Sequence, residues 1–468
     1  MKTLAFLPLL ALAGCVATPA TPPRPAPVTA PAQLVATQGA DAVALARWWT
    51  AWGDPALDAI VEQALAANPD LRAARAHVAA SRALVSVAEG GLYPTIAAQG
   101  AVWGGYSDAN VDGALGQVFA PYTTTGSAQG RAVNLGASWE PDLFGGRHAD
   151  VAAARALSDS AALAAQGVRL MVVGDVVENY QQLQGLRQRL ALLDRSIATA
   201  RGLVDYASAR MGAGQATAAD ISKARGGVEQ LSAARAPLVA LIDVRRRRLA
   251  VLAGLPPERE VAISAPDRLS VPSTPGGQVP SAVLLRRPDV QAHAALVRMQ
   301  AARLKSLKAD LLPSFAIHFI GQSGTLELSG LPGYGGSSAL AGISATVPIF
   351  TGGRLRARVV AGNAELTAAL ADQDKALLLA LEEVEAAYGF RHGLDDRLAG
   401  LERAADLASQ RAAQQGAFYQ AGRATKGDTL QADLAVLEAQ DTLAQARIAR
   451  ASATVQLFRA LGGGWDAP

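Results

Sequence analysis

Residues that could carry out chemistry are few in this sequence, and they do not form a recognisable catalytic or metal-binding motif. The histidines are isolated from one another, and the His-Glu-x-x-His pattern of a zinc enzyme does not occur. The segment from Gly422 to Gly427 contains glycines and Lys426, but in the wrong order for a phosphate-binding loop. The sequence therefore predicts a protein that is not an enzyme and holds no cofactor or metal ion.

The single cysteine, Cys15, points to a different chemistry. Residues 1–14 have a basic residue, an apolar core and small residues at the end, which is typical of a signal peptide. The residues Leu-Ala-Gly before Cys15 resemble the lipobox of bacterial lipoproteins, in which the cysteine carries diacylglycerol. We therefore expect lipidation at Cys15, with a free thiol as the alternative. Val16 in place of an aspartate favours sorting to the outer membrane, and the proline-rich segment 15–45 predicts an extended tether.

Charge gives little support for a nucleic-acid partner. The chain has 43 basic and 40 acidic residues, and its net charge is +3. The run Arg245 to Arg248 is the local exception. It predicts a solvated helix face, with an anion-binding patch as the alternative.

Two stretches of the chain share one order of elements. Residues 131–142 alternate between apolar and small polar side chains, pass through Gly145, Gly146 and Arg147, and lead into a proline-free tract with apolar residues every three or four positions. Residues 339–350 lead through Gly352, Gly353 and Arg354 into a second such tract. A helix over 147–210 would be about 95 Å long, so it needs a partner along its length.

Conserved offsets between these stretches indicate an internal duplication. Pro288 and Pro313 follow Pro69 and Pro94 by the same 219 positions, whereas Gly352 follows Gly145 by 207, which predicts a longer hairpin loop in the first copy. Each copy is predicted to be helix, helix, strand, strand, long helix and return helix. The predicted parts are a first repeat at 46–254 with strands near 94–106 and 131–142, a crossover at 255–280, and a second repeat at 281–464 with strands near 313–323 and 339–350.

The alternating strands have the pattern of a transmembrane β-barrel, with apolar residues facing lipid and polar residues facing the interior. Four strands cannot close, and open edges cannot be satisfied in lipid. Several copies are therefore required. Eight strands leave an interior filled by side chains, so an open pore implies at least three copies.

An ordered set of motifs carries a family resemblance. They are Trp48-Trp49, Asp54-Pro55, Asn68-Pro69-Asp70, Tyr93-Pro94, Pro141 to Arg147, Pro348 to Arg354, Tyr419 to Gly422, and Leu461 to Trp465. Together they resemble the TolC-like outer-membrane factors, specifically the NodT and OprM type of efflux lipoprotein.

The resemblance implies a mainly α fold with a transmembrane β part, in which a homotrimer forms a twelve-stranded β-barrel continued by a periplasmic α-helical barrel. It implies an anchor in outer-membrane lipid of a Gram-negative bacterium. It also implies two partners, a periplasmic adaptor (membrane fusion) protein and an inner-membrane pump of the resistance-nodulation-division (RND) type.

The turns between the long and the return helices are, by resemblance, the periplasmic gate and the adaptor contact. The family commonly has an acidic gate residue where this chain has Gln431. Asp428, three residues earlier, could substitute for it in a trimeric ring and pair with Lys426, and Asp220 holds the same place in the first repeat. The alternative is simple turn chemistry, in which both aspartates belong to helix-capping boxes. At the other end of the long helices, the glycine pairs 145–146 and 352–353 are expected to permit the change of direction from barrel to tube.

The predicted function is that of a passive efflux duct for small molecules such as drugs and toxic compounds. Export of metal cations or type I secretion of proteins through the same architecture is an alternative. A lipidated coiled-coil scaffold with soluble hairpins is another.

Overall fold

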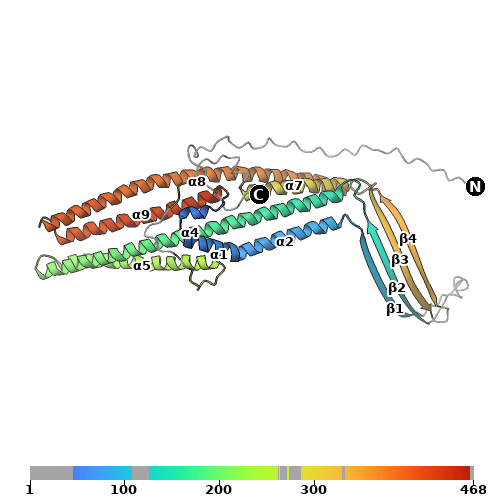
Figure 1. Ribbon diagram of the computed structural model, residues 1–468, viewed down its shortest axis with the longest axis horizontal. Helices are drawn as coiled ribbons and strands as arrows, with labels where there is room; N and C mark the ends of the chain where they lie inside the picture. Colours follow the sequence, from blue (N-terminus) through green and yellow to red (C-terminus); the bar gives the residue numbers. More distant parts are fainter. Residues whose placement is uncertain are drawn as a thin grey trace, which may run out of the picture. The chain divides into compact units, whose positions relative to one another are not determined.

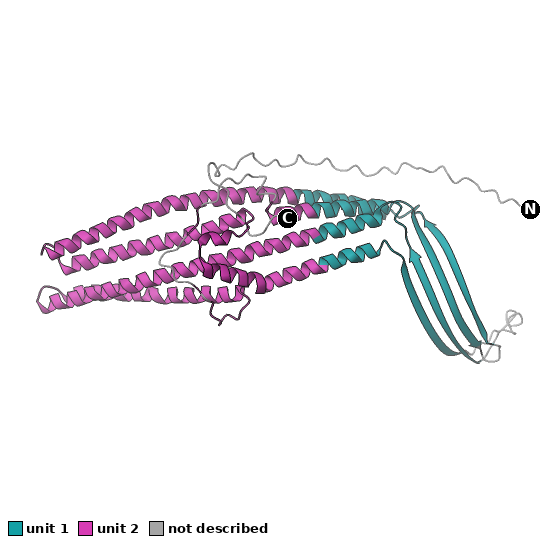
Figure 2. Ribbon diagram, in the orientation of Figure 1, with its two compact units in different colours: residues 1–25, 81–158, 296–371 teal, residues 26–80, 159–295, 372–468 magenta. Residues whose placement is uncertain are grey.

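The computed structural model describes residues 46–107, 126–261, 263, 271–273, 286–328 and 333–463. These residues form two compact units, coloured separately in Figure 2. The strand unit comprises the described parts of 81–158 and 296–371, and the helix unit those of 46–80, 159–295 and 372–463. The predicted signal peptide, the lipidation site Cys15 and the tether all lie outside the described residues.

The elements repeat in the predicted order (Figure 1). The first repeat contains η2 (Trp48–Trp52), α1 (Pro55–Ala67), α2 (Pro69–Gly90), β1 (Thr95–Ser107), β2 (Gly126–Trp139), α4 (Gly146–Gly212) and α5 (Ala218–Leu252). The second contains α7 (Pro288–Ala309), β3 (Ser314–Leu328), β4 (Tyr334–Thr346), α8 (Arg354–Gln420) and α9 (Lys426–Ala460). Both long helices have 67 residues and both return helices have 35. The predicted fold class, mainly α with a smaller β part, is confirmed.

The four strands form one antiparallel sheet in the order β1-β2-β3-β4. The central pair, β2 and β3, joins the two repeats, with Trp139 opposite Ile317. The outer strands β1 and β4 each have a neighbour on one side only within the described sheet. The sheet of a single chain is therefore open at both edges.

The strand boundaries differ from those expected from the sequence. β2 and β4 begin at Gly126 and Tyr334, five residues before the expected starts, because their glycine- and serine-rich first residues pair by backbone although they lack apolar alternation. They also end earlier, at Trp139 and Thr346. A proline follows two residues after each end, and proline has no N–H with which to continue a ladder.

The core of the helix unit is built around the tryptophans of η2. The Trp48 ring stacks on Phe458 with ring centroids 4.8 Å apart, and both side chains are fully buried. A helix cap fixes this region, since Asp54 accepts hydrogen bonds from the first turn of α1 and from the Tyr180 hydroxyl at 2.6 Å. One described helix, α4, has an apolar stretch long enough to cross a membrane by length and composition. Four valines of α4 are buried in this core, namely Val172, Val173, Val176 and Val177.

The long helices of the helix unit lie in a row in the order α5, α4, α9, α8 (Figure 1). Salt bridges join neighbours along the row, namely Arg235–Asp194 (2.8 Å), Arg189–Asp441 (2.8 Å) and Arg450–Asp395 (2.7 Å). A small apolar cluster adds Leu192 of α4 to Leu437 of α9. The outer helices of the row are therefore α5 and α8, just as β1 and β4 are the outer strands of the sheet.

Candidate pore and gate

The sheet separates its side chains into an apolar and a polar face. Residues paired across an antiparallel sheet point to the same face, so the register assigns each strand residue to one of them. Most of the large apolar residues share one face, among them Ile96, Val102, Val133, Leu135, Trp139, Ile317, Phe319 and Ile343. The opposite face carries the polar residues Thr95, Gln99, Asn134, Ser138, His318, Gln322 and Ser344, together with the apolar residues Trp103, Ile320, Leu326, Tyr334 and Leu340. One continuous apolar surface thus covers all four strands.

A polar rim bounds this apolar face at the end far from the helices. Gln129 donates a hydrogen bond to Glu327 at 2.8 Å, and Arg131 donates to the Thr325 hydroxyl at 3.1 Å. From Trp139 to Arg131 the strand rises by about 26 Å. That length matches the apolar band of about 25 Å that an outer-membrane barrel presents to lipid.

The polar face carries no formally charged side chain on the described strands. Its one histidine, His318, lies with Nε2 3.1 Å from the Ser344 hydroxyl oxygen. Farther along the strands, Trp103 lies flat over Gly130, where an added Cβ would approach the ring to 2.4 Å. This face combines amide and hydroxyl groups with apolar side chains such as Trp103, Ile320 and Leu340, and because it lacks formal charge it would not sort solutes strongly by charge.

The first of the two predicted barrel-to-helix junctions is fixed by local polar contacts. Asp142 accepts a hydrogen bond from the backbone N–H of His148 at 2.8 Å and thereby caps the start of α4. Arg147 pairs with Glu140 at 2.7 Å. Gly145 has φ of 74°, but Gly146 already belongs to α4 and does not need a positive φ.

The glycine pairs therefore have different roles in the two junctions, which corrects the expectation of a shared one. At Gly146 an added Cβ would lie 3.0 Å from the Ala309 side chain, so this glycine permits close packing of α4 on α7. At the second junction both Gly352 and Gly353 have positive φ, 58° and 81°. Arg354 follows them as an exposed residue at the start of α8.

The two predicted gate turns are built alike. Gly214 and Gly422 have φ of 73° and 70° at the ends of α4 and α8. Asp220 and Asp428 then complete capping boxes with Thr217 and Thr425 at the starts of α5 and α9. The structure thus brings each of these aspartates into a helix cap.

Within one chain, Lys426 does not pair with Asp428, and their pairing in a trimeric ring stays a prediction. The Asp428 carboxylate is turned back to accept from the Thr425 N–H at 2.8 Å, and the Lys426 ammonium lies 5.7 Å from the centre of the Tyr419 ring. Gln431 is exposed one turn farther along α9. Neither it nor Lys426 is needed to close the turn.

Both capping aspartates are held in their charged form. The hydroxyl and backbone N–H of Thr425 lower the pKa of Asp428 below its ordinary value. The backbone N–H and then the hydroxyl of Thr217 lower the pKa of Asp220 in the same way. Each chain therefore presents two exposed negative charges at its turns at neutral pH.

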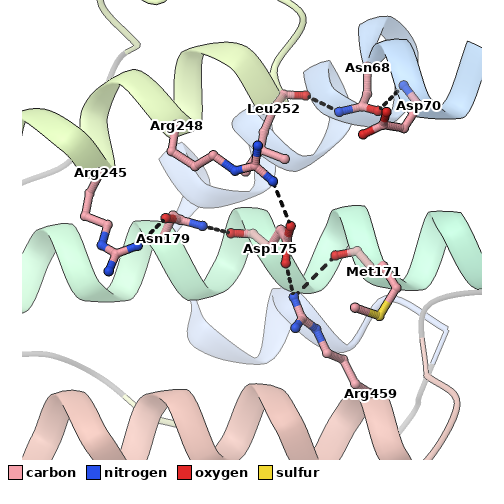
Figure 3. A network of polar contacts seen from close by, with 9 residues as sticks. All are labelled: Asn68, Asp70, Met171, Asp175, Asn179, Arg245, Arg248, Leu252 and Arg459. Atoms are coloured by element: carbon pink, nitrogen blue, oxygen red, sulfur yellow. Dashed lines mark hydrogen bonds and ion pairs between the residues drawn. The ribbon is translucent and has the colours of Figure 1, made fainter.

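A polar network ties the helix row together at Asp175 of α4 (Figure 3). Its carboxylate binds Arg248 of α5 at 3.1 Å and Arg459 of α9 at 2.6 Å. Arg459 also donates to the backbone oxygen of Met171 at 3.3 Å. Gly174 makes room for this arginine, because a Cβ there would lie 1.9 Å from the Arg459 Nε. The sequence offered no pattern that would identify this site.

The arginine run on α5 is engaged within the chain. Arg246 pairs with Asp243 (2.9 Å) and Glu260 (2.7 Å), and Arg247 pairs with Asp243 (2.6 Å). Arg248 binds Asp175, and Arg245 donates to the Asn179 side chain at 3.2 Å. Each arginine of the run thus has an acidic or amide partner in the same chain, which does not favour the anion-binding alternative.

Comparisons with known proteins agree on one family. The family model described as outer membrane efflux protein matches residues 60–255 and 279–463. The pyoverdine export outer membrane protein OpmQ of Pseudomonas aeruginosa is 30% identical over 100% of this chain and 98% of its own length. Nodulation protein T of Rhizobium leguminosarum bv. trifolii is 26% identical over 99% of this chain and 97% of its own length. The outer-membrane channel OprN has a similar structure, with a TM-score of 0.81 and 27% identity over 95% of this chain and 99% of that one.

Proposed function

The chain belongs to the outer membrane efflux protein family, and we propose that three copies of it close into one continuous duct. Membership makes it an efflux channel of the Gram-negative outer membrane, as the sequence predicted. The family consists of channels rather than enzymes. The observation that carries the trimer is that the sheet and the helix row are each open at both ends.

Closure of the sheet requires β1 of one copy to pair with β4 of the next, because those strands carry the free edges. Unsatisfied edge groups are not tolerated in the hydrocarbon region of a membrane. Two copies would give eight strands and an interior filled by side chains, whereas three give twelve and leave a pore. Three is thus the smallest number of copies that yields a duct.

The helix row supports the same closure independently. Its outer helices expose large apolar side chains: Val244 of α5 is 55% exposed, and Phe390 and Leu407 of α8 are 60% and 65% exposed. Joining α5 of one copy to α8 of the next would cover them. Three copies then give a ring of twelve long helices, matching the twelve strands.

The proposed gate and the proposed contacts with partner proteins lie at the turns between the long and the return helices. We infer that the exposed carboxylates Asp220 and Asp428 form a ring of six negative charges around the periplasmic mouth, with Lys426 and Gln431 beside it. A periplasmic adaptor protein docking at these turns, together with an inner-membrane pump of the RND type, would supply the opening force and the energy. The duct itself is passive.

Small molecules are the proposed cargo, because the polar face of the strands presents amides and hydroxyls that suit solutes of either charge. OpmQ is a pyoverdine export protein, which is consistent with an organic solute. Export of metal cations or secretion of proteins remains the alternative. Lipidation of Cys15 would hold the chain at the membrane, and replacing Cys15 with Ser should abolish labelling by a radioactive fatty acid.

Two experiments test the duct. On denaturing gels, an unboiled sample of the purified protein should run as a trimer. The protein should also conduct ions in planar bilayers. A monomer without conductance would favour the scaffold alternative. Deletion of the gene should raise sensitivity to some members of a panel of antibiotics, dyes, detergents and metals. Sensitivity to metals alone would assign cation export instead.

Asp428→Asn and Asp428→Lys separate the gate charge from the helix cap. Asparagine can still accept the capping hydrogen bond, so conductance that changes in both variants reports the charge. Arg411→Gln on α8, an exposed residue outside the turn, is the control. Wild-type conductance in both Asp428 variants would contradict a role for this carboxylate in the gate.

A further inference from the structure

The second barrel-to-helix junction exposes large apolar side chains. Ile349 is 94% exposed and Phe350 is 91% exposed, and Val347 before them is 57% exposed. Val347 follows β4 with the same alternation as Ile343, so it extends the apolar face of the sheet. This exposed apolar surface is thus continuous with the face that lies against lipid.

Three arginines follow directly on α8. Arg354, Arg356 and Arg358 are all exposed, and none forms an ion pair or side-chain hydrogen bond among the described residues. Arg354 and Arg358 line the same cavity as Glu140 and Asp142, whereas Arg356 points to the other side of α8. The first turn of α8 contains no acidic residue. Cations at the start of a helix oppose its dipole, so these arginines do not serve the stability of α8.

The first repeat gives an internal comparison, because its junction lies 207 positions earlier. The positions of Val347 and Ile349 correspond to Glu140 and Asp142, and those of Arg356 and Arg358 correspond to the buried Ala149 and Val151. Arg147, the counterpart of Arg354, pairs with Glu140. The second junction has thus exchanged two acids for apolar residues and gained two free cations, which the shared scaffold does not require.

We propose that residues 347–358, the junction anchor, bind the phospholipid surface of the periplasmic leaflet. Ile349 and Phe350 enter the boundary between headgroups and acyl chains, and Arg356, on the side of α8 away from the acidic cavity, contacts lipid phosphates, with Arg354 and Arg358 adding positive charge nearby. A second copy of the chain is the other candidate to cover this surface. Lipid is favoured because charged residues are depleted at the core of protein interfaces, whereas apolar side chains flanked by cations are typical of interfacial membrane segments. The proposal rests on the membrane placement of the sheet but not on the number of copies.

Site-directed spin labelling of the full-length protein in phospholipid vesicles tests the apolar part. Cysteine is introduced singly as Phe350→Cys, as Ile343→Cys on the apolar face of β4, and as Phe418→Cys near the turn at the far end of α8. The parent protein measures any background labelling of Cys15. Oxygen concentrates among acyl chains and a charged nickel chelate stays in water, so the ratio of the two accessibilities reports the surroundings of each label.

The expected result is an oxygen-to-nickel ratio at 350 that is close to that at 343 and several-fold above that at 418. A ratio at 350 equal to that at 418 would place the anchor in water and overturn the proposal. A label inaccessible to both reagents would mean that another copy covers the site, which also overturns it. An aqueous ratio at 343 as well would refute the membrane placement of the sheet, a failure distinguishable from that of the anchor alone.

A second measurement tests the arginines. Spin-labelled phosphatidylglycerol and phosphatidylcholine are compared for the fraction that the protein immobilises. Wild type should prefer the anionic lipid, by about fivefold for one well-placed arginine. The triple variant Arg354→Gln, Arg356→Gln and Arg358→Gln should lose most of that preference, whereas Lys223→Gln with Arg225→Gln on α5 should retain it. An unchanged preference in a correctly assembled triple variant would overturn the phosphate contact.

Discussion

Replacing Gly174 with alanine should destabilise the protein when residue 459 is arginine and stabilise it when residue 459 is alanine. In the wild-type background the new Cβ would lie 1.9 Å from the Arg459 Nε and 2.6 Å from its Cζ, so the guanidinium must move. Moving it gives up the 2.6 Å contact with Asp175. Such a charged hydrogen bond, partly exposed to solvent, is worth about 1.5 kcal/mol. Alanine gains about 1 kcal/mol over glycine in a helix, so the net effect is a loss of about 0.5 kcal/mol.

In the Arg459→Ala background there is no guanidinium to displace. The same Gly174→Ala change should then stabilise the helix unit by the full helix-propensity gain, about 1 kcal/mol. The two effects differ by about 1.5 kcal/mol, which is the coupling energy of a double-mutant cycle. Gly226→Ala on α5 is the matched control, because an added Cβ there meets nothing within 4 Å. It should give the bare gain in both backgrounds.

Pulse proteolysis with thermolysin across a urea series measures these free energies on the detergent-solubilised protein. Four proteins complete the cycle, and the control adds two. If Gly174→Ala shifts the urea midpoint equally in both backgrounds, the contact between Gly174 and Arg459 does not limit stability, and the argument from packing is refuted.

Three further changes test other parts of the structure. Because the folded pKa values of Asp220 and Asp428 are lowered, their capping contribution is present above the unfolded pKa of about 3.9 and is lost as the pH falls through the folded values. Hydrogen exchange at the starts of α5 and α9, corrected for intrinsic rates, should therefore accelerate only below about pH 4. Arg391→Ala should destabilise the protein by about 3 kcal/mol in the same urea assay, because it empties a fully buried site, whereas the exposed Arg403→Ala should stay within about 0.5 kcal/mol. Phe458→Ala should cost about 4 kcal/mol, because it removes a buried ring stacked on tryptophan, and melting followed by circular dichroism would show it; a loss below about 1 kcal/mol would contradict that packing.

Short-range sequence signals predicted most of the helices. Asp54 before Pro55, and Thr425 three residues before Asp428, are short-range signals whose geometry depends on a few neighbouring atoms, and the structure contains both caps. The duplication strengthened these signals, since each long helix and its turn occur twice. The family and the function followed from the ordered motifs.

Contacts between distant segments could not be found in this way. Nothing local distinguishes Gly174, whose small size matters only because Arg459 lies against it nearly three hundred residues later. Gly146 was expected to share the turning role of Gly145, but its constraint comes from Ala309 on another helix. The early starts of β2 and β4 were missed for a related reason, because their pairing is made by backbone groups that are the same for every residue type.

The equal lengths of the two hairpins limit how this protein can evolve. Both long helices have 67 residues and both return helices have 35. Each copy of the chain therefore contributes two helical hairpins, here called arms, of equal length. An insertion in one arm alone would leave its turn out of step with the other and shift the seam around the helix. A lineage that needs a longer or shorter reach must therefore change both arms together, in steps near seven residues. Compensated pairs of insertions and deletions, one in each repeat, are the genetic trace that this coupling would leave.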